Sequence, residues 1–176
     1  MRADVSTRAR SQGEGGQVIV LMALFLSLVG LAIVGTVLDF GLLAARNSAA
    51  DAAAYLGAQA GGGTINDAAF SAGRLALVGV SGGSCSVTGT GAPTGSCQEG
   101  GLLTAAGACA VVAAANDAAS SAKIICTQRG LTVTATVQQT VTFPVGIFGV
   151  GGRVKSTRQA GPAYGTNHSI QLSQLP

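Results

Sequence analysis

The chain has 176 residues, of which 48% are hydrophobic, 10% are charged and 4% are aromatic, and its formal net charge is +3. Ordinary soluble domains contain about 25% charged residues, so this composition is not that of a typical soluble protein. The residues from Asp39 to the end are enough for one modest domain and not for two.

An uncharged segment from Val18 to Leu38 dominates the N-terminal region. As a helix rising about 1.5 Å per residue it spans about 30 Å, the thickness of the hydrocarbon core of a bilayer. Residues 1–16 before it are polar and basic, and we expect them to form a disordered cytoplasmic leader. Their arginines favour a cytoplasmic N-terminus and an exported C-terminal part; these are Arg2, Arg8 and Arg10.

A cleaved secretory signal is the alternative interpretation of this segment. Such signals have a hydrophobic core of about 7–15 residues that ends at a small-residue cleavage site. The present segment is longer and ends at Leu38-Asp39-Phe40, a poor cleavage site. We therefore predict a single-pass anchor in the cytoplasmic membrane, with membrane lipid as its first partner.

The helix is expected to continue beyond the lipid and to span residues 17–60. Small and apolar residues recur there at three- and four-residue spacing, which is typical of a helix face packed on protein; they are Leu38, Leu42, Ala45, Ala49, Ala52 and Leu56. Gly61-Gly62-Gly63 ends the helix. Within the lipid, a small-residue face offers close packing to another helix, and its members are Ser27, Gly30, Ala32 and Gly35. Exposure of that face to lipid is the alternative.

Residues 61–160 predict an exported α+β domain with two shorter helices and a C-terminal β-hairpin or small antiparallel sheet. The second helix is expected to start at Thr64 or Asn66 as N-cap and to continue through Val78. Residues 79–101 are rich in Gly, Ser and Thr and predict a long loop. A third helix is expected over residues 102–116.

Near the end of this domain, apolar residues recur at every second position. Apolar and threonine residues alternate from Leu131 toward Phe143, which predicts a half-buried strand. Residues 153–157 predict the returning strand of a hairpin. Residues 161–176 have the composition of a loose C-terminal tail.

All four cysteines fall in the predicted exported part: Cys85, Cys97, Cys109 and Cys126. An even number of cysteines in an exported domain favours two disulfides, and three pairings are open. A metal site is not expected, because the cysteine spacing contains no C-x-x-C pair and His168 is the chain's histidine.

No catalytic or cofactor-binding arrangement is apparent in the sequence. His168 lies in the tail away from any acidic residue, and the carboxylates are scattered. The glycine clusters lack the strand-bounded spacing that binds phosphate. Arg153, Lys155 and Arg158 could indicate nucleic acid, but few aromatic residues accompany them, and cations on an edge strand commonly prevent aggregation. We therefore expect neither an enzyme, nor a cofactor, nor a nucleic-acid partner.

The N-terminal quarter resembles the TadE/TadG-like family of tight-adherence (Flp-type) pilus assembly proteins. The resemblance is carried by Gly16-Gln17-Val18-Ile19-Val20, the apolar run, Leu38-Asp39-Phe40-Gly41, Arg46, and the block from Ala49 to Ala54 around Asp51. It implies a pilin-like membrane subunit of a surface filament or secretion apparatus, with other subunits of that apparatus as partners.

The resemblance also implies a processing site. Pilin-like members are cut by a prepilin peptidase just after a glycine, which here is Gly16 and leaves Gln17 first. Those members have a glutamate near the start of the mature chain, where Leu21 stands here. This difference brings the chain closer to the TadG-like proteins, whose helix is an anchor, and both a cleaved and an uncleaved leader stay open.

We therefore expect a structural component, a minor pilin or an accessory protein, of a Tad-like apparatus. One alternative is an extracellular binding module that is merely tethered by the helix, with residues 81–101 as its recognition surface. Another is a secreted hydrolase with an atypical signal, which the lack of a nucleophile–base arrangement disfavours.

Overall fold

The computed structural model describes residues 11–89, 91–117, 121–143 and 151–162. The longest element is a helix of 52 residues, α1 (Ser11–Gly62), which is followed by a short helix, α2 (Asp67–Ser71). The remaining elements are β1 (Ser84–Thr88), β2 (Thr94–Gly95), β3 (Gln98–Glu99), β4 (Leu102–Leu103), α3 (Ala105–Asn116), β5 (Lys123–Arg129), β6 (Thr132–Val141) and β7 (Gly152–Ala160). The expectations for residues 1–10 and for the tail from 163, including His168, lie outside the described residues.

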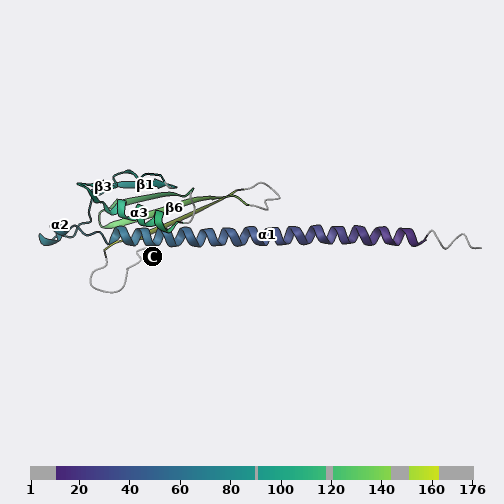
Figure 1. Cartoon of the computed structure of the whole chain (residues 1–176). Helices are drawn as coiled ribbons and strands as arrows, with labels where there is room; N and C mark the ends of the chain where they lie inside the picture. Colours follow the sequence, from purple (N-terminus) through teal and green to yellow (C-terminus); the bar gives the residue numbers. More distant parts are fainter. Residues whose placement is uncertain (1–10, 90, 118–120, 144–150, 163–176) are drawn as a thin grey trace, which may run out of the picture.

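The folded domain lies along the C-terminal half of α1, while the N-terminal half extends away from it (Figure 1). Five strands form an antiparallel sheet in the order β2-β1-β5-β6-β7, and β3 and β4 form a small separate ladder. The predicted hairpin is β6–β7, paired from Val133 opposite Ala160 to Val141 opposite Gly152. The expected α+β layout with a long N-terminal helix and a C-terminal antiparallel sheet is thus confirmed.

Three strands of the sheet, β1, β2 and β5, are missing from the sequence-based prediction, and β2 lies inside the predicted loop over residues 79–101. β1 lies inside the segment predicted to be a loop, and β5 was not predicted at all. In β1 the alternation is short, because only Cys85 and Val87 are buried, while Ser84 and Thr88 are exposed and Ser86 is half-buried. In β5 the polar Gln128 occupies a buried position, which obscures the two-residue period.

The helix boundaries also differ from the predicted ones. α1 begins at Ser11, so the end of the predicted leader is helical. α2 does start after Asn66, whose side chain accepts a hydrogen bond from the Ala69 N–H, but it ends at Ser71. Gly73, at φ +70°, takes a conformation that a right-handed helix cannot continue, and Leu77 instead bridges to Ile65. α3 begins after Thr104, whose side chain accepts from the Gly107 N–H at 3.0 Å.

The core joins α1, α3 and the inner face of the sheet through small side chains. Buried alanines of α1 and α3 lie against sheet residues such as Ile124, Val133 and Val137. Two glycines let the helix backbones touch. A Cβ at Gly57 would lie 2.8 Å from the Ala113 Cβ, and one at Gly61 would lie 2.6 Å from a backbone oxygen of α3. The close helix contact therefore requires glycine at both positions.

Two disulfides link the elements around this core. Cys85–Cys97 joins β1 to the segment before β3, and Cys109–Cys126 joins α3 to β5. The sequence separations are 12 and 17 residues. Loop closures of that size contribute about 3 kcal/mol each in the chain-entropy treatment. The pairing, which was open in the sequence, is settled by which strands and helices are neighbours.

Candidate functional site

The first functional element is the exposed apolar half of α1. From Val18 to Leu38 its large side chains face outward; Phe25 is 68% and Leu31 is 72% exposed. The helix from Gly16 to Gly62 contains a window of mean hydropathy 2.9 of which only 6% is buried. Among the described residues it is the one helix long and apolar enough to cross a membrane. Exposing such an apolar surface to water costs free energy, whereas the hydrocarbon core of a membrane accommodates it. α1 is therefore suited to anchor the chain by a single pass.

The residues predicted for processing and helix packing lie on this half of α1. Gly16 and Gln17 are exposed and helical. Ser27 and Gly30 are exposed, Ala32 is half-buried and Gly35 is buried. The Ser27 hydroxyl donates to the Ala23 carbonyl oxygen at 2.8 Å, which satisfies it inside the helix as a membrane segment requires. Cleavage after Gly16 and packing of another helix on the small-residue face stay predictions.

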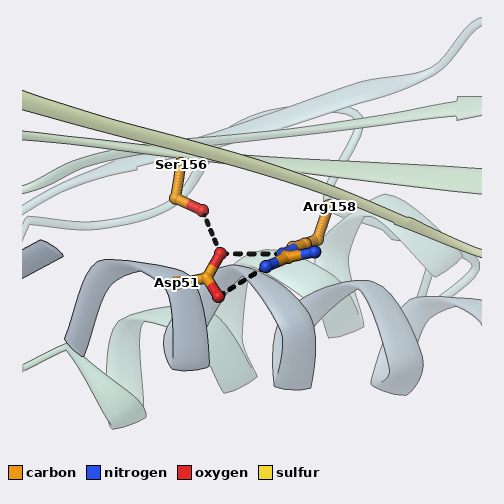
Figure 2. Close-up of polar contacts among 3 residues, drawn as sticks. All are labelled: Asp51, Ser156 and Arg158. Carbon is orange, nitrogen blue, oxygen red and sulfur yellow. Dashed lines mark hydrogen bonds and ion pairs between the residues drawn. The ribbon is translucent and has the colours of Figure 1, made fainter. Parts of the chain in front are cut away.

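The second element is a three-residue contact that fixes the domain to α1 (Figure 2). The Arg158 guanidinium donates from Nε to Oδ1 of Asp51 at 2.7 Å and from Nη2 to Oδ2 at 2.6 Å. The Ser156 hydroxyl donates to the same Oδ1 at 2.7 Å. Ser156 and Arg158 are two residues apart on β7, so both side chains are on the strand face turned to α1. Asp51 thus accepts hydrogen bonds from the last strand of the sheet.

The electrostatics of this contact follow from its geometry. The Arg158 guanidinium, and after it the Ser156 hydroxyl, hold the pKa of the Asp51 carboxyl below its ordinary value. The same ion pair raises the pKa of Arg158. Both side chains are 40% exposed, so solvent screens the pair and its net contribution is about 1 kcal/mol at most. Its main effect is to fix the position of β7 along α1.

The structure separates the three cations that the sequence placed together on β7. Arg158 is turned to α1 and paired with Asp51, whereas Arg153 and Lys155 are exposed on the opposite face of the sheet. β7 is an edge strand of the sheet. The expectation that all three cations protect this sheet edge from aggregation is therefore too simple, because Arg158 pairs with Asp51 of α1.

Sequence reasoning missed the partners of Asp51 and the role of the two packing glycines. Asp51 is the carboxylate in an alanine-rich stretch. Ser156 and Arg158 are two residues apart at the end of the predicted strand, so on a strand their side chains would lie on the same face. These patterns indicate which polar side chains could pair, but they do not indicate which of them do. Likewise Gly57 and Gly61 stand at the four-residue spacing of close helix contacts. The close packing predicted in the membrane, at Ser27, Gly30, Ala32 and Gly35, concerns another part of α1 and stays a prediction.

The described residues were also compared with the requirements of a metal site and of a reactive thiol. In the ranges given above, no group of three or more His, Cys, Asp or Glu side chains could hold a metal ion, and every cysteine is in a disulfide. In comparisons with known protein families, curated proteins and solved structures, the chain has no match. The resemblance to TadE/TadG-like proteins therefore depends on the sequence motifs alone.

Proposed function

We propose that this protein is a non-enzymatic, membrane-anchored structural subunit, a minor pilin or accessory component, of a Tad/Flp-type pilus or secretion apparatus. The observation that supports it most is the division of α1 into two halves. One half presents exposed large apolar side chains, and the other carries a disulfide-linked domain (Figure 1). That division suits a subunit that is held in a membrane and displays a domain outside it.

The proposed orientation places the N-terminus in the cytoplasm and the domain outside. The arginines before the apolar run favour that direction. The two disulfides agree with it, since disulfides persist in oxidising compartments and are rare in the cytosol.

A membrane-tethered binding module is the second candidate. The observation in its favour is the β3–β4 ladder, in which Leu102 is 68% and Leu103 is 40% exposed, close to the Cys85–Cys97 disulfide. Adjacent exposed apolar side chains can form part of a recognition surface. The two functions differ in what the protein binds, and one experiment separates them.

That experiment is isolation of the full-length chain from its native membranes after mild crosslinking. The structural role predicts a stable complex that contains a secretion ATPase and a membrane platform protein. Recovery of an extracellular ligand without those subunits would support the binding module instead, and recovery of the chain alone would contradict both proposals.

Anchoring is tested with a matched pair of substitutions on α1. Leu28→Arg puts a cation at the centre of the apolar run, where insertion costs about 2.5–3.5 kcal/mol. Leu56→Arg makes the same change at an exposed position beyond the lipid. We expect the wild type and Leu56→Arg to stay in membranes after a carbonate wash and Leu28→Arg to be released in part. A wild-type chain in the soluble fraction would overturn the anchor.

Processing is tested by mass spectrometry of the mature N-terminus. A start at Gln17 supports cleavage after Gly16 and a pilin-like subunit, whereas an intact Met1 supports an accessory anchor. A start near Asp39 would overturn both and revive a secreted product.

A further inference from the structure

Three cations border a groove of about 510 Å³ on the outer face of the sheet. Lys123 of β5 lies opposite Gln138 of β6, which lies opposite Lys155 of β7. Arg153 lies two residues before Lys155 and is paired across the strands with Thr140. The three cationic side chains are exposed. They therefore converge on one patch from two strands with a third between them.

One carboxylate contacts the groove from outside its lining, since Asp117 accepts a hydrogen bond at Oδ1 from the amide of the lining residue Gln139. The groove is lined by cationic, amide, hydroxyl and one apolar side chain, with no carboxylate among them. The salt bridge found among the described residues, between Asp51 and Arg158, involves none of Lys123, Arg153 and Lys155. Arg153 and Lys155 lie two residues apart on β7 and Lys123 lies two strands away, so the three like charges repel each other. An anionic partner would remove that repulsion, so the patch has the chemistry of a phosphate-binding surface.

The patch lies at the end of the sheet that faces the membrane half of α1. Gly152, the first residue of β7, lies against α1: a Cβ there would be 3.4 Å from the Leu43 Cδ1 atom. β7 then runs away from that point until Ala160 reaches the end of α1 near Gly62. Figure 1 shows the same arrangement, with the β6–β7 end of the sheet extending along α1 toward its N-terminal half.

The level of this patch above the lipid follows from the geometry of α1. Leu43 is about 7 Å along the helix axis beyond Leu38, where the uncharged run ends. The headgroup layer of one leaflet is about 5–8 Å thick, so Gly152 lies near its outer boundary. Arg153 is about 3 Å farther along the strand, and Lys155 is about 10 Å farther. Arg153 therefore lies within side-chain reach of the headgroups, and Lys155, with Lys123 at the same level, lies about one Debye length from them at 0.1 M salt, which is about 10 Å.

We propose that Lys123, Arg153 and Lys155 form a docking surface for the anionic phospholipid headgroups of the membrane that α1 crosses. The surface holds the sheet close to the bilayer and limits rotation of the domain about the axis of α1. The inference depends on anchoring by α1, but it does not depend on assembly into a pilus apparatus.

The opposite end of the domain provides an internal control. Arg74 follows α2 and Arg129 ends β5, and both are exposed. This end lies beside the C-terminus of α1, far from the apolar run (Figure 1). Exposed carboxylates, Asp67 and Glu99, accompany these arginines. Removing cations there changes the net charge of the protein without touching the proposed surface.

The experiment uses the full-length chain in phosphatidylcholine vesicles that contain traces of spin-labelled lipid. Electron spin resonance measures how strongly labelled phosphatidylglycerol associates with the protein relative to labelled phosphatidylcholine. Each cation near a membrane surface contributes about a fivefold factor at low salt. We expect a several-fold preference for the anionic lipid, and we expect Lys123→Gln/Arg153→Gln/Lys155→Gln to lower it at least about fivefold. Arg74→Gln/Arg129→Gln should leave it within about twofold of the wild type.

The outcomes decide the proposal. The arginines of the N-terminal leader are present in every variant, so the difference between variants isolates the sheet. Equal preference in the wild type and the triple variant would overturn the docking surface, as would an equal loss in the distal control. If 10 mM inorganic phosphate displaced the labelled lipid at constant ionic strength, the groove would be a site for soluble phosphate instead. A failure to copurify with a secretion ATPase would leave this measurement unaffected, because it needs only α1 in the bilayer.

Discussion

Substitution of Gly57 by alanine tests whether α1 and α3 pack backbone to backbone. Gly57 lies in the part of α1 that is covered by α3, and an added Cβ would be 2.8 Å from both the Ala113 Cβ and the Cys109 carbonyl oxygen. Neither atom can rotate away, and ordinary carbon contacts need about 3.5–4.0 Å. α3 would have to move by most of an ångström, yet the Cys109–Cys126 disulfide ties it to β5.

The magnitude follows from two opposing effects. Alanine in place of glycine inside a helix stabilises it by about 1 kcal/mol. Overpacking a close contact costs about 1–3 kcal/mol. Gly41→Ala is the matched control, since it lies in the same helix with nothing within 4 Å of its added Cβ. We therefore expect Gly57→Ala to be less stable than Gly41→Ala by about 1–3 kcal/mol.

The assay is urea pulse proteolysis of the full-length chain in detergent with both disulfides intact. It reports unfolding of the domain even when the membrane half of α1 stays helical in the micelle. Equal urea midpoints for Gly57→Ala and Gly41→Ala would refute the reasoning, because the two helices could not then be in backbone contact. Gly61→Ala offers a second measurement, since its added Cβ would meet the Val133 Cγ1 atom at 2.7 Å.

Three further predictions concern the other contacts of the domain. Asp51→Asn should lower stability by at most about 1 kcal/mol at pH 7, because Arg158 loses its charged partner. Since pairing lowers the pKa of Asp51 in the folded state, this difference should be constant above about pH 5 and shrink below about pH 4 in pH-dependent urea unfolding; a difference that grows in acid would contradict it. Thr104→Ala should cost about 1–2 kcal/mol by the same assay, because the buried hydroxyl both caps α3 and donates to a backbone oxygen; an unchanged midpoint would argue against the cap. Peptide mapping without reduction should recover Cys109 linked to Cys126, and their joint replacement by alanine should cost about 3 kcal/mol; recovery of either one linked elsewhere would refute the connectivity.

The sequence by itself determined the features that depend on local periodicity. The apolar run predicts a spanning helix, and the alternation from Leu131 onward predicts β6 and its hairpin partner. The N-cap at Asn66 is equally local, because the side chain bonds a backbone N–H only three residues away. In each case neighbours along the chain suffice to set the backbone conformation.

Only the tertiary structure decided which distant segments meet. β1 is a strand because β5 supplies its hydrogen-bonding partner, whereas its five residues stand in a glycine-, serine- and threonine-rich segment that shows little strand preference. Asp51 and Arg158 are far apart in the chain and meet because α1 and β7 share one face of the core. The position of the cationic patch relative to the lipid likewise follows from where β7 begins along α1. Such contacts depend on which surfaces are buried together, and no short window of sequence contains that information.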